Sequence, residues 1–184
     1  MTRGSGPGSA HVALLRGVNV GGRNKLSMGE IASAFEDIGC GEVRTYIQSG
    51  NVVFRAPARL AARLPGLAAD RIARGAGFRP GVFVRTAKEL GDAVRNNPYG
   101  PSATKALHVG FLATAPGPGA VARLDPRRSP PDSFAVRWRE IYLHCPNGMG
   151  RTRLSGAYFE SVLEEDVTFR NWRTVLALLE MTGG

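Results

Sequence analysis

Cysteine and long apolar runs are what this sequence has least of. Its two cysteines, Cys40 and Cys145, cannot build a disulfide framework, and neither belongs to a Cys-x-x-Cys pair. We expect both to be buried free thiols. No run approaches the ~18 consecutive apolar residues of a membrane span, and the N-terminus lacks the cationic-then-apolar layout of a secretory signal. We therefore expect a cytoplasmic protein with no membrane attachment.

Groups that could hold a metal or act as nucleophiles are also few. The three histidines, His11, His108 and His144, are scattered along the chain. His144 and Cys145 are adjacent, so they point to opposite sides of a strand, which argues against a zinc site and against a histidine-activated thiol. No Gly-x-Ser-x-Gly motif is present. We predict no metal and no cofactor.

Positive charge, by contrast, is abundant. The formal net charge is +9 over 184 residues, which favours acidic partners, nucleic acid above all. Only three of the cations are lysine, however, and an arginine skew in an alanine- and glycine-rich chain also arises from nucleotide bias in a genome. The charge therefore indicates function only where cations cluster, and they do so in a few loops.

The pattern of apolar residues predicts an α+β fold. In the first half we expect strands at 12–15, 43–47, 52–54 and 81–84, a helix that begins at Met28, and a second helix over 58–74 that breaks at Pro65-Gly66. The order strand, helix, strand, strand, helix, strand is the split β-α-β arrangement of ferredoxin-like folds. Capping boxes, Ser27 with Glu30 and Thr86 with Glu89, open two of the helices.

The second half repeats this mixture of elements. We expect a helix after Thr86, strands at 106–112, 134–138 and 140–144, at most a short helix near Val121, and helices over 154–163 and 172–181, joined by a connection at 164–171. His108 is expected to face solvent or lie at an edge. The predicted fold class is thus two ferredoxin-like (split β-α-β) layers with C-terminal helices, in subdomains 11–85 and 86–184 that follow a disordered tail at 1–10.

The most distinctive stretch is A-L-L-R-G-V-N-V-G-G-R-N-K, residues 13–25. An apolar strand passes directly into a loop that contains three glycines, two asparagines and three cations, and such a loop can present N–H groups and positive charge to an anion. It is not a P-loop, because that motif needs Lys and then Ser or Thr where Arg23 and Asn24 stand. The alternative is that the glycines serve only a tight turn.

We predict that three polar stretches, 16–25, 48–51 and 170–174, converge on one cationic site. Binding residues gather on such loops, and Arg170-Asn171 precede a helix start, where anions are favoured. Asn171 could equally be only an N-cap. The predicted ligand-binding residues are Arg16, Asn19, Gly21, Gly22, Arg23, Asn24, Lys25, Gln48, Ser49, Asn51, Arg170 and Asn171.

Four motifs in this order resemble the domain of unknown function 1697 (DUF1697) family. They are residues 13–25, V-R-T-Y-I-Q-S-G-N-V-V-F (43–54), N-P-Y (97–99) and T-F-R-N-W-R-T-V (168–175). The resemblance covers about Val12 to Met181. It implies a small cytoplasmic bacterial α+β protein without a settled activity. Its motifs mark the predicted site residues other than Arg23 and add Gly17, Gly50 and Thr174, whereas Pro65-Gly66 departs from the usual pattern.

Three functions remain open from the sequence. The first is a module that binds a phosphate-bearing ligand, nucleic acid or nucleotide, through Arg23, Lys25 and Arg170. The second is an enzyme acting on a small anionic metabolite, in which Arg16 or Arg23 holds the anion and Ser49 or Tyr46 transfers a proton; no base with an evident partner is visible. The third is a protein-interaction domain whose loops serve only the fold.

Overall fold

The computed structural model describes residues 8–183 and divides into two compact units. Unit 1 comprises Met1–Gly91 with Leu178–Gly184, and unit 2 comprises Asp92–Ala177. The predicted tail at 1–10 falls mostly outside the described residues, although Ser9 and Ala10 already belong to the first strand. No described helix has both the length and the apolar composition needed to cross a membrane.

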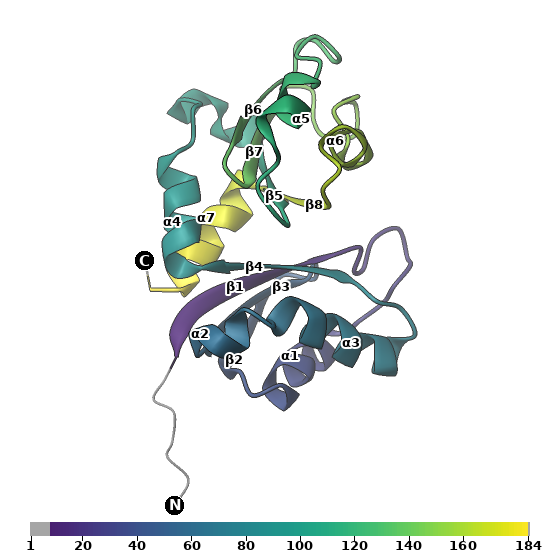
Figure 1. Cartoon of the computed structure of the whole chain (residues 1–184), viewed down its shortest axis with the longest axis vertical. Coiled ribbons are helices and arrows are strands. Elements are labelled where there is room, and N and C mark those ends of the chain that lie inside the picture. Colours follow the sequence, from purple (N-terminus) through teal and green to yellow (C-terminus); the bar gives the residue numbers. More distant parts are fainter. Residues whose placement is uncertain (1–7, 184) are drawn as a thin grey trace, which may run out of the picture. The chain divides into compact units, whose positions relative to one another are not determined.

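Unit 1 is an antiparallel sheet with helices, and its strands are coloured purple to teal in Figure 1. Its strands lie in the order β2-β3-β1-β4, and β1 pairs with both β3 and β4, so β1 is central. The elements in chain order are β1 (Ser9–Arg16), α1 (Met28–Asp37), β2 (Gly41–Tyr46), β3 (Asn51–Ala56), α2 (Ala58–Ala61), α3 (Leu64–Ala76), β4 (Gly81–Thr86) and the start of α4 (Ala87–Arg95). This order and pairing confirm the predicted ferredoxin-like arrangement.

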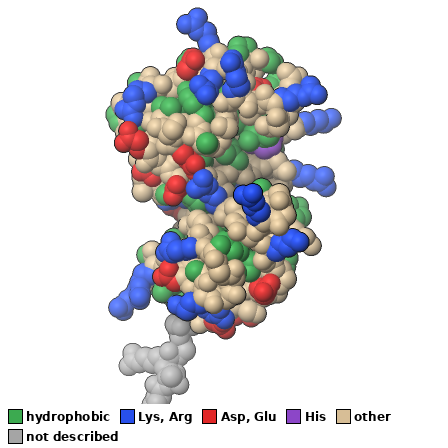
Figure 2. Space-filling model, turned by 90° about the vertical axis from the view of Figure 1, so that its right-hand side faces the viewer, with side chains coloured by type: hydrophobic (Ala, Val, Ile, Leu, Met, Phe, Trp, Pro, Cys, Tyr) green, Lys and Arg blue, Asp and Glu red, His purple; other side chains and the backbone are tan. Residues whose placement is uncertain are grey.

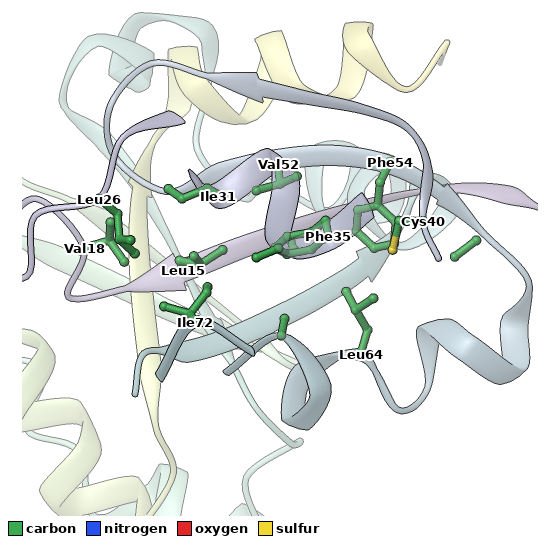
Figure 3. Packing of buried hydrophobic residues seen from close by; sticks show 14 of the residues in the cluster. Leu15, Val18, Leu26, Ile31, Phe35, Cys40, Val52, Phe54, Leu64 and Ile72 are labelled. Atoms are coloured by element: carbon green, nitrogen blue, oxygen red, sulfur yellow. The ribbon is translucent and has the colours of Figure 1, made fainter. Parts of the chain in front are cut away.

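The core of unit 1 forms between the sheet and helices α1 and α3. Leu15 and Phe54 from the strands meet Ile31 and Phe35 from α1 and Leu64 from α3, all of them fully shielded from water (Figure 3). Burial of side chains of this size stabilises the fold by about 1.5–3 kcal/mol each. Local chemistry sets the start of α1: the Ser27 hydroxyl accepts the Glu30 N–H at 3.1 Å, and the Glu30 carboxylate accepts the Ser27 N–H at 2.8 Å.

The predicted helix over 58–74 is indeed interrupted, but at a different place. Helix α2 ends at Ala61 and α3 begins at Leu64, so Pro65 stands in the first turn of α3 and not at a break. A proline there sacrifices no hydrogen bond, because the first N–H groups of a helix have no partner within the helix. Pro65, which would disrupt the interior of a helix, therefore stands where a helix begins.

Unit 2 has the same topology. Its sheet order is β6-β7-β5-β8, in which β5 is central and all pairs are antiparallel. The elements are the end of α4, the 3₁₀ helix η1 (Pro101–Ala106), β5 (Leu107–Leu112), α5 (Pro118–Ala122), β6 (Ser133–Arg137), β7 (Glu140–His144), α6 (Gly156–Leu163), β8 (Val167–Asn171) and most of α7 (Trp172–Met181). The order strand, helix, strand, strand, helix, strand thus occurs twice. The predicted fold class of two ferredoxin-like layers is confirmed, although the last strand of unit 2 was not predicted.

Strand β8 corrects one sequence expectation. We assigned 164–171 to a connection, whereas Val167–Asn171 pairs with β5 along its length. The buried positions of this strand include Thr168 and Arg170. A strand that buries polar side chains lacks the alternation of apolar and polar residues by which strands are recognised.

Candidate functional site

The loop after β1, residues 17–25, contains a short β-hairpin, and we call it the hairpin loop. Val20 and Arg23 form an isolated antiparallel bridge, in which the Arg23 N–H donates to the Val20 carbonyl at 3.0 Å. The two residues between them, Gly21 and Gly22, have φ angles of 57° and 75°. Two-residue hairpin turns of type I′ need positive φ at both positions, which explains the glycine pair without any ligand.

Two asparagine amides fix this hairpin to its surroundings. Asn19 Nδ2 donates to the Leu26 carbonyl at 2.8 Å and to the Gln48 carbonyl at 3.1 Å, while its Oδ1 accepts the Leu26 N–H at 2.9 Å. Asn24 Nδ2 donates to the Gly17 carbonyl at 2.9 Å. Both asparagines have positive φ, which Asn tolerates better than most residues. Both amides stabilise the loop. That of Asn19 uses both of its N–H groups in doing so and is not available as the ligand donor that the sequence suggested, whereas Asn24 uses one N–H group and is exposed.

The turn between β2 and β3 lies against the same loop through the Asn19–Gln48 bond. Within it, Asn51 is 0% exposed and donates to the Tyr46 carbonyl at 3.1 Å and to Ser49 Oγ at 2.9 Å. Asn51 therefore holds the turn from inside, whereas Gln48 and Ser49 are exposed. The structure brings together the predicted stretches 16–25 and 48–51.

Three cations of this loop, Arg16, Arg23 and Lys25, are exposed. Some other cations of unit 1 pair with acids, as Arg55 does with Glu42 at 3.0 Å, whereas the exposed Arg59, Arg63 and Arg74 form no ion pair within the described residues. Within residues 8–183, neither Arg23 nor Lys25 forms an ion pair. Figure 2 shows Lys and Arg side chains spread widely over the visible face, interspersed with acidic ones, so density of charge does not distinguish this loop. Its distinction is that Arg23 and Lys25 stand beside the open turn of Gly21 and Gly22.

A cavity of about 400 Å³ lies beside the hairpin, lined by Asn19, Gly22, Lys25, Leu26, Ser27, Glu30 and Gln48. Its one acidic side chain is the capping residue Glu30. Hydrogen bonds from the backbone and side chain of Ser27 lower the pKa of Glu30, so the carboxylate is ionised at neutral pH and cannot serve as a proton donor. An anion would accordingly bind at the Gly22–Lys25 rim, away from this carboxylate.

The remaining predicted residues belong to unit 2. Arg170 is largely buried, and its Nη1 donates to Thr168 Oγ1 at 2.9 Å and to the Phe169 carbonyl at 2.8 Å. Burial lowers its pKa to about 10, so it remains charged at neutral pH. Asn171 Oδ1 accepts the Thr174 N–H at 2.8 Å, which is the N-cap role considered from the sequence. Convergence of these residues with the loop of unit 1 stays a prediction.

Unit 2 contains a second cavity that the sequence did not reveal. About 560 Å³ in volume, it is lined by Thr104, Lys105, Leu107, His108, Asn171, Trp172, Arg173 and Leu176. His108, expected at an edge, lies instead on the central strand β5 and is half-buried. No local pattern could have found it, because Lys105 and His108 at the start of β5 meet Arg173 after β8 only where these two strands pair.

Protonation of the half-buried His108 makes the stability of the protein depend on pH. Burial lowers its pKa below 6.5, opposed by a hydrogen bond with the Ala106 backbone. The unfolded chain therefore takes up this proton first, so stability is intact above about pH 6.5 and falls as the pH drops toward the folded-state pKa. Urea unfolding between about pH 7 and about pH 5 should show a shallower decline for His108→Asn than for the native chain. Equal declines would contradict this assignment.

The cysteines are free and buried, as predicted. Burial raises the pKa of both Cys40 and Cys145 to about 11, so both remain protonated thiols and poor nucleophiles at neutral pH. Among the described residues, no three His, Cys, Asp or Glu side chains gather as a metal site would require.

Comparison with solved structures supports the fold. The chain is similar to the conserved bacterial protein SP0830 from Streptococcus pneumoniae, with a TM-score of 0.66 and 22% sequence identity over 95% of this chain and 98% of that one. At this identity the likeness concerns the fold alone. No curated protein matches the sequence.

The family comparison agrees with the motifs. The family described as "Protein of unknown function (DUF1697)" matches residues 9–142, which include every element from β1 to β6 and the first residues of β7. Three of the four motifs noted in the sequence, including the stretch 13–25, which contains the hairpin loop, and the turn at 48–51, fall within this match. The chain belongs to the DUF1697 family.

Proposed function

We propose that the protein binds a phosphate-bearing ligand, a nucleotide or single-stranded nucleic acid, at the hairpin loop of unit 1. Arg23 and Lys25 contact the phosphate, and the N–H groups of Gly21 and Gly22 contribute further donors. The observation that carries the proposal is the pair of exposed cations without ion-pair partners on a loop that Asn19 and Asn24 hold in place. Charge that no neighbouring acid neutralises is available to an anion.

The hairpin turn supports this assignment through its unused donors. Within the part of the chain that the structure describes, the N–H groups of Gly21 and Gly22 donate to no other residue. A Cβ placed on either glycine would meet nothing within 4 Å, so the space around the turn is open. Consecutive N–H groups with positive φ can bind an anion oxygen.

Two exposed aliphatic side chains favour a ligand that carries a nucleobase over inorganic phosphate. Val20 is 65% and Ile47 is 51% exposed, and the Asn19–Gln48 bond ties their turns together. Ile47 also has a φ of 47°, which is unusual for a β-branched residue and costs conformational energy. Such outliers cluster at binding sites, and an apolar rim beside cations suits a nucleobase next to its phosphate.

Binding of a fluorescein-labelled single-stranded oligothymidylate, followed by anisotropy, tests the proposal. For the native chain we expect affinity to fall steeply from about 50 mM to about 200 mM salt, because each neutralised phosphate contributes about −0.7 to the slope of log K against log salt concentration. The variant Arg23→Ala/Lys25→Ala should bind more weakly and should show a slope smaller in magnitude by about 1.4.

The matched control is Arg59→Ala/Arg74→Ala, which removes the same charge from exposed helical positions of unit 1. Its affinity and salt slope should stay closer to the native values. Equal weakening in the two double variants would show that only net charge matters and would overturn the proposed site. Absence of binding to both the oligonucleotide and ATP would reject the function itself.

A further inference from the structure

We propose that the cavity of unit 2 binds a small organic carboxylate that has an apolar or aromatic body. This site is separate from the hairpin loop of unit 1, and the proposal does not rest on the function assigned there. Four elements build it: η1, β5, the end of β8 and the first turns of α7. At about 560 Å³, it has the size of pockets that hold small molecules.

Three of the lining side chains form an apolar wall. Leu107 and Trp172 are almost completely buried and face the cavity from β5 and α7, and Leu176, one turn beyond Trp172 on α7, is 41% exposed. An exposed leucine beside an indole in a concave site offers apolar area that a ligand can remove from water. The wall therefore selects for an apolar body on the ligand.

The charged side chains of the cavity are all basic. Lys105 comes from η1 and Arg173 from α7, both are exposed, and neither forms an ion pair within residues 8–183. The lining contains no aspartate or glutamate. Two unpaired cations from different elements, without an acid between them, select for a negatively charged group on the ligand.

The polar groups at the base of the cavity strengthen this choice. Helix α7 begins at Trp172, and Asn171 already caps its Thr174 N–H, so the earlier N–H groups of the first turn remain for a carboxylate oxygen. The ring of His108 lines the same space.

The cavity supplies its own spectroscopic probe. The chain contains two tryptophans, Trp138, which is exposed, and Trp172, which lines the cavity. In the full-length Trp138→Phe variant, all tryptophan emission reports on this site. Titration with phenylacetate should change that emission saturably, whereas acetate, which lacks the ring, and phenethylamine, which has the opposite charge, should bind about tenfold more weakly or not at all.

Charge reversal tests the assignment of the cations. In the Trp138→Phe background, Lys105→Glu/Arg173→Glu should weaken phenylacetate binding about tenfold or more, because charge-assisted hydrogen bonds are replaced by repulsion. The matched control, Arg127→Glu/Arg151→Glu, reverses two other exposed arginines of unit 2 and should leave binding unchanged. Both changes lie at exposed positions, and far-ultraviolet circular dichroism checks that each variant is folded.

Three results would overturn the proposal. Equal affinity for phenylacetate and phenethylamine would remove the role of the cations, and equal affinity for phenylacetate and inorganic phosphate would remove the role of the apolar wall. No change in Trp172 emission with phenylacetate, together with no chemical-shift change at the Trp172 indole N–H, would show that the cavity takes no such ligand.

Discussion

Replacing Gly50 with alanine is expected to lower the free energy of unfolding by about 3 kcal/mol. The residue has a φ of 70°, a conformation that costs a residue with a Cβ about 1–2 kcal/mol. In addition, a Cβ there would lie 2.8 Å from Leu15 Cβ and 3.2 Å from the Leu15 carbonyl oxygen. Backbone and Cβ atoms of a buried central strand cannot move aside cheaply, so overpacking adds to the conformational cost.

A second glycine separates the conformational cost of positive φ from the cost of overpacking. Gly77, at the end of α3, has a φ of 75°, but a Cβ there would meet nothing within 4 Å. Gly77→Ala should therefore lose only the conformational part, about 1 kcal/mol. Urea unfolding of both variants measures the difference, and equal losses would show that the contact with Leu15 is relieved at no cost.

The position of Gly50 explains why this effect matters for the candidate site. Its carbonyl accepts the Leu15 N–H at 2.8 Å, so the turn that presents Gln48 and Ser49 is fastened to the last residues of β1, where the hairpin loop begins. A shift of this turn would move both predicted stretches of unit 1 together. We expect Gly50→Ala to weaken oligonucleotide binding as well as stability.

Features determined by neighbours in sequence were predictable. The capping boxes at Ser27 and Thr86 form as expected, because each depends on a hydroxyl and a carboxylate three residues apart. The four strands of unit 1 also followed from apolar periodicity and turn residues. Pro65 was predicted less well, because proline both breaks helices and begins them, and only the place where α3 starts decides between these roles.

The candidate site was less accessible to sequence reasoning, since an asparagine that binds a ligand and one that binds the backbone are identical in sequence. Asn19 and Asn51 were both assigned to a ligand, yet their amides hold the main chain of two turns. Arg170 was placed in a loop because its strand buries polar residues. The cavity around His108 depends on which strands pair, and no local pattern encodes that information.

Replacing Asn19 with alanine should show how much the fixed shape of the loop contributes to stability and binding, because the charge of the loop is retained. The change removes three hydrogen bonds, two to Leu26 and one to Gln48, at a residue with a φ of 56°, and we expect it to lower stability by about 2 kcal/mol. Asn24→Ala is the matched comparison, because it removes one such bond, to Gly17, at a similar φ of 51°. Its loss should be about 1 kcal/mol.

The binding of these two variants then tests whether the loop must be held in place to bind. Both retain Arg23 and Lys25, so the number of phosphates neutralised, and with it the salt slope, should remain native. Asn19→Ala should nevertheless bind the oligonucleotide about five- to tenfold more weakly, because the loop must be ordered at the moment of binding. Native affinity in Asn19→Ala would mean that the cations act without the hairpin, and the fixed geometry of residues 19–24 would then have no part in recognition.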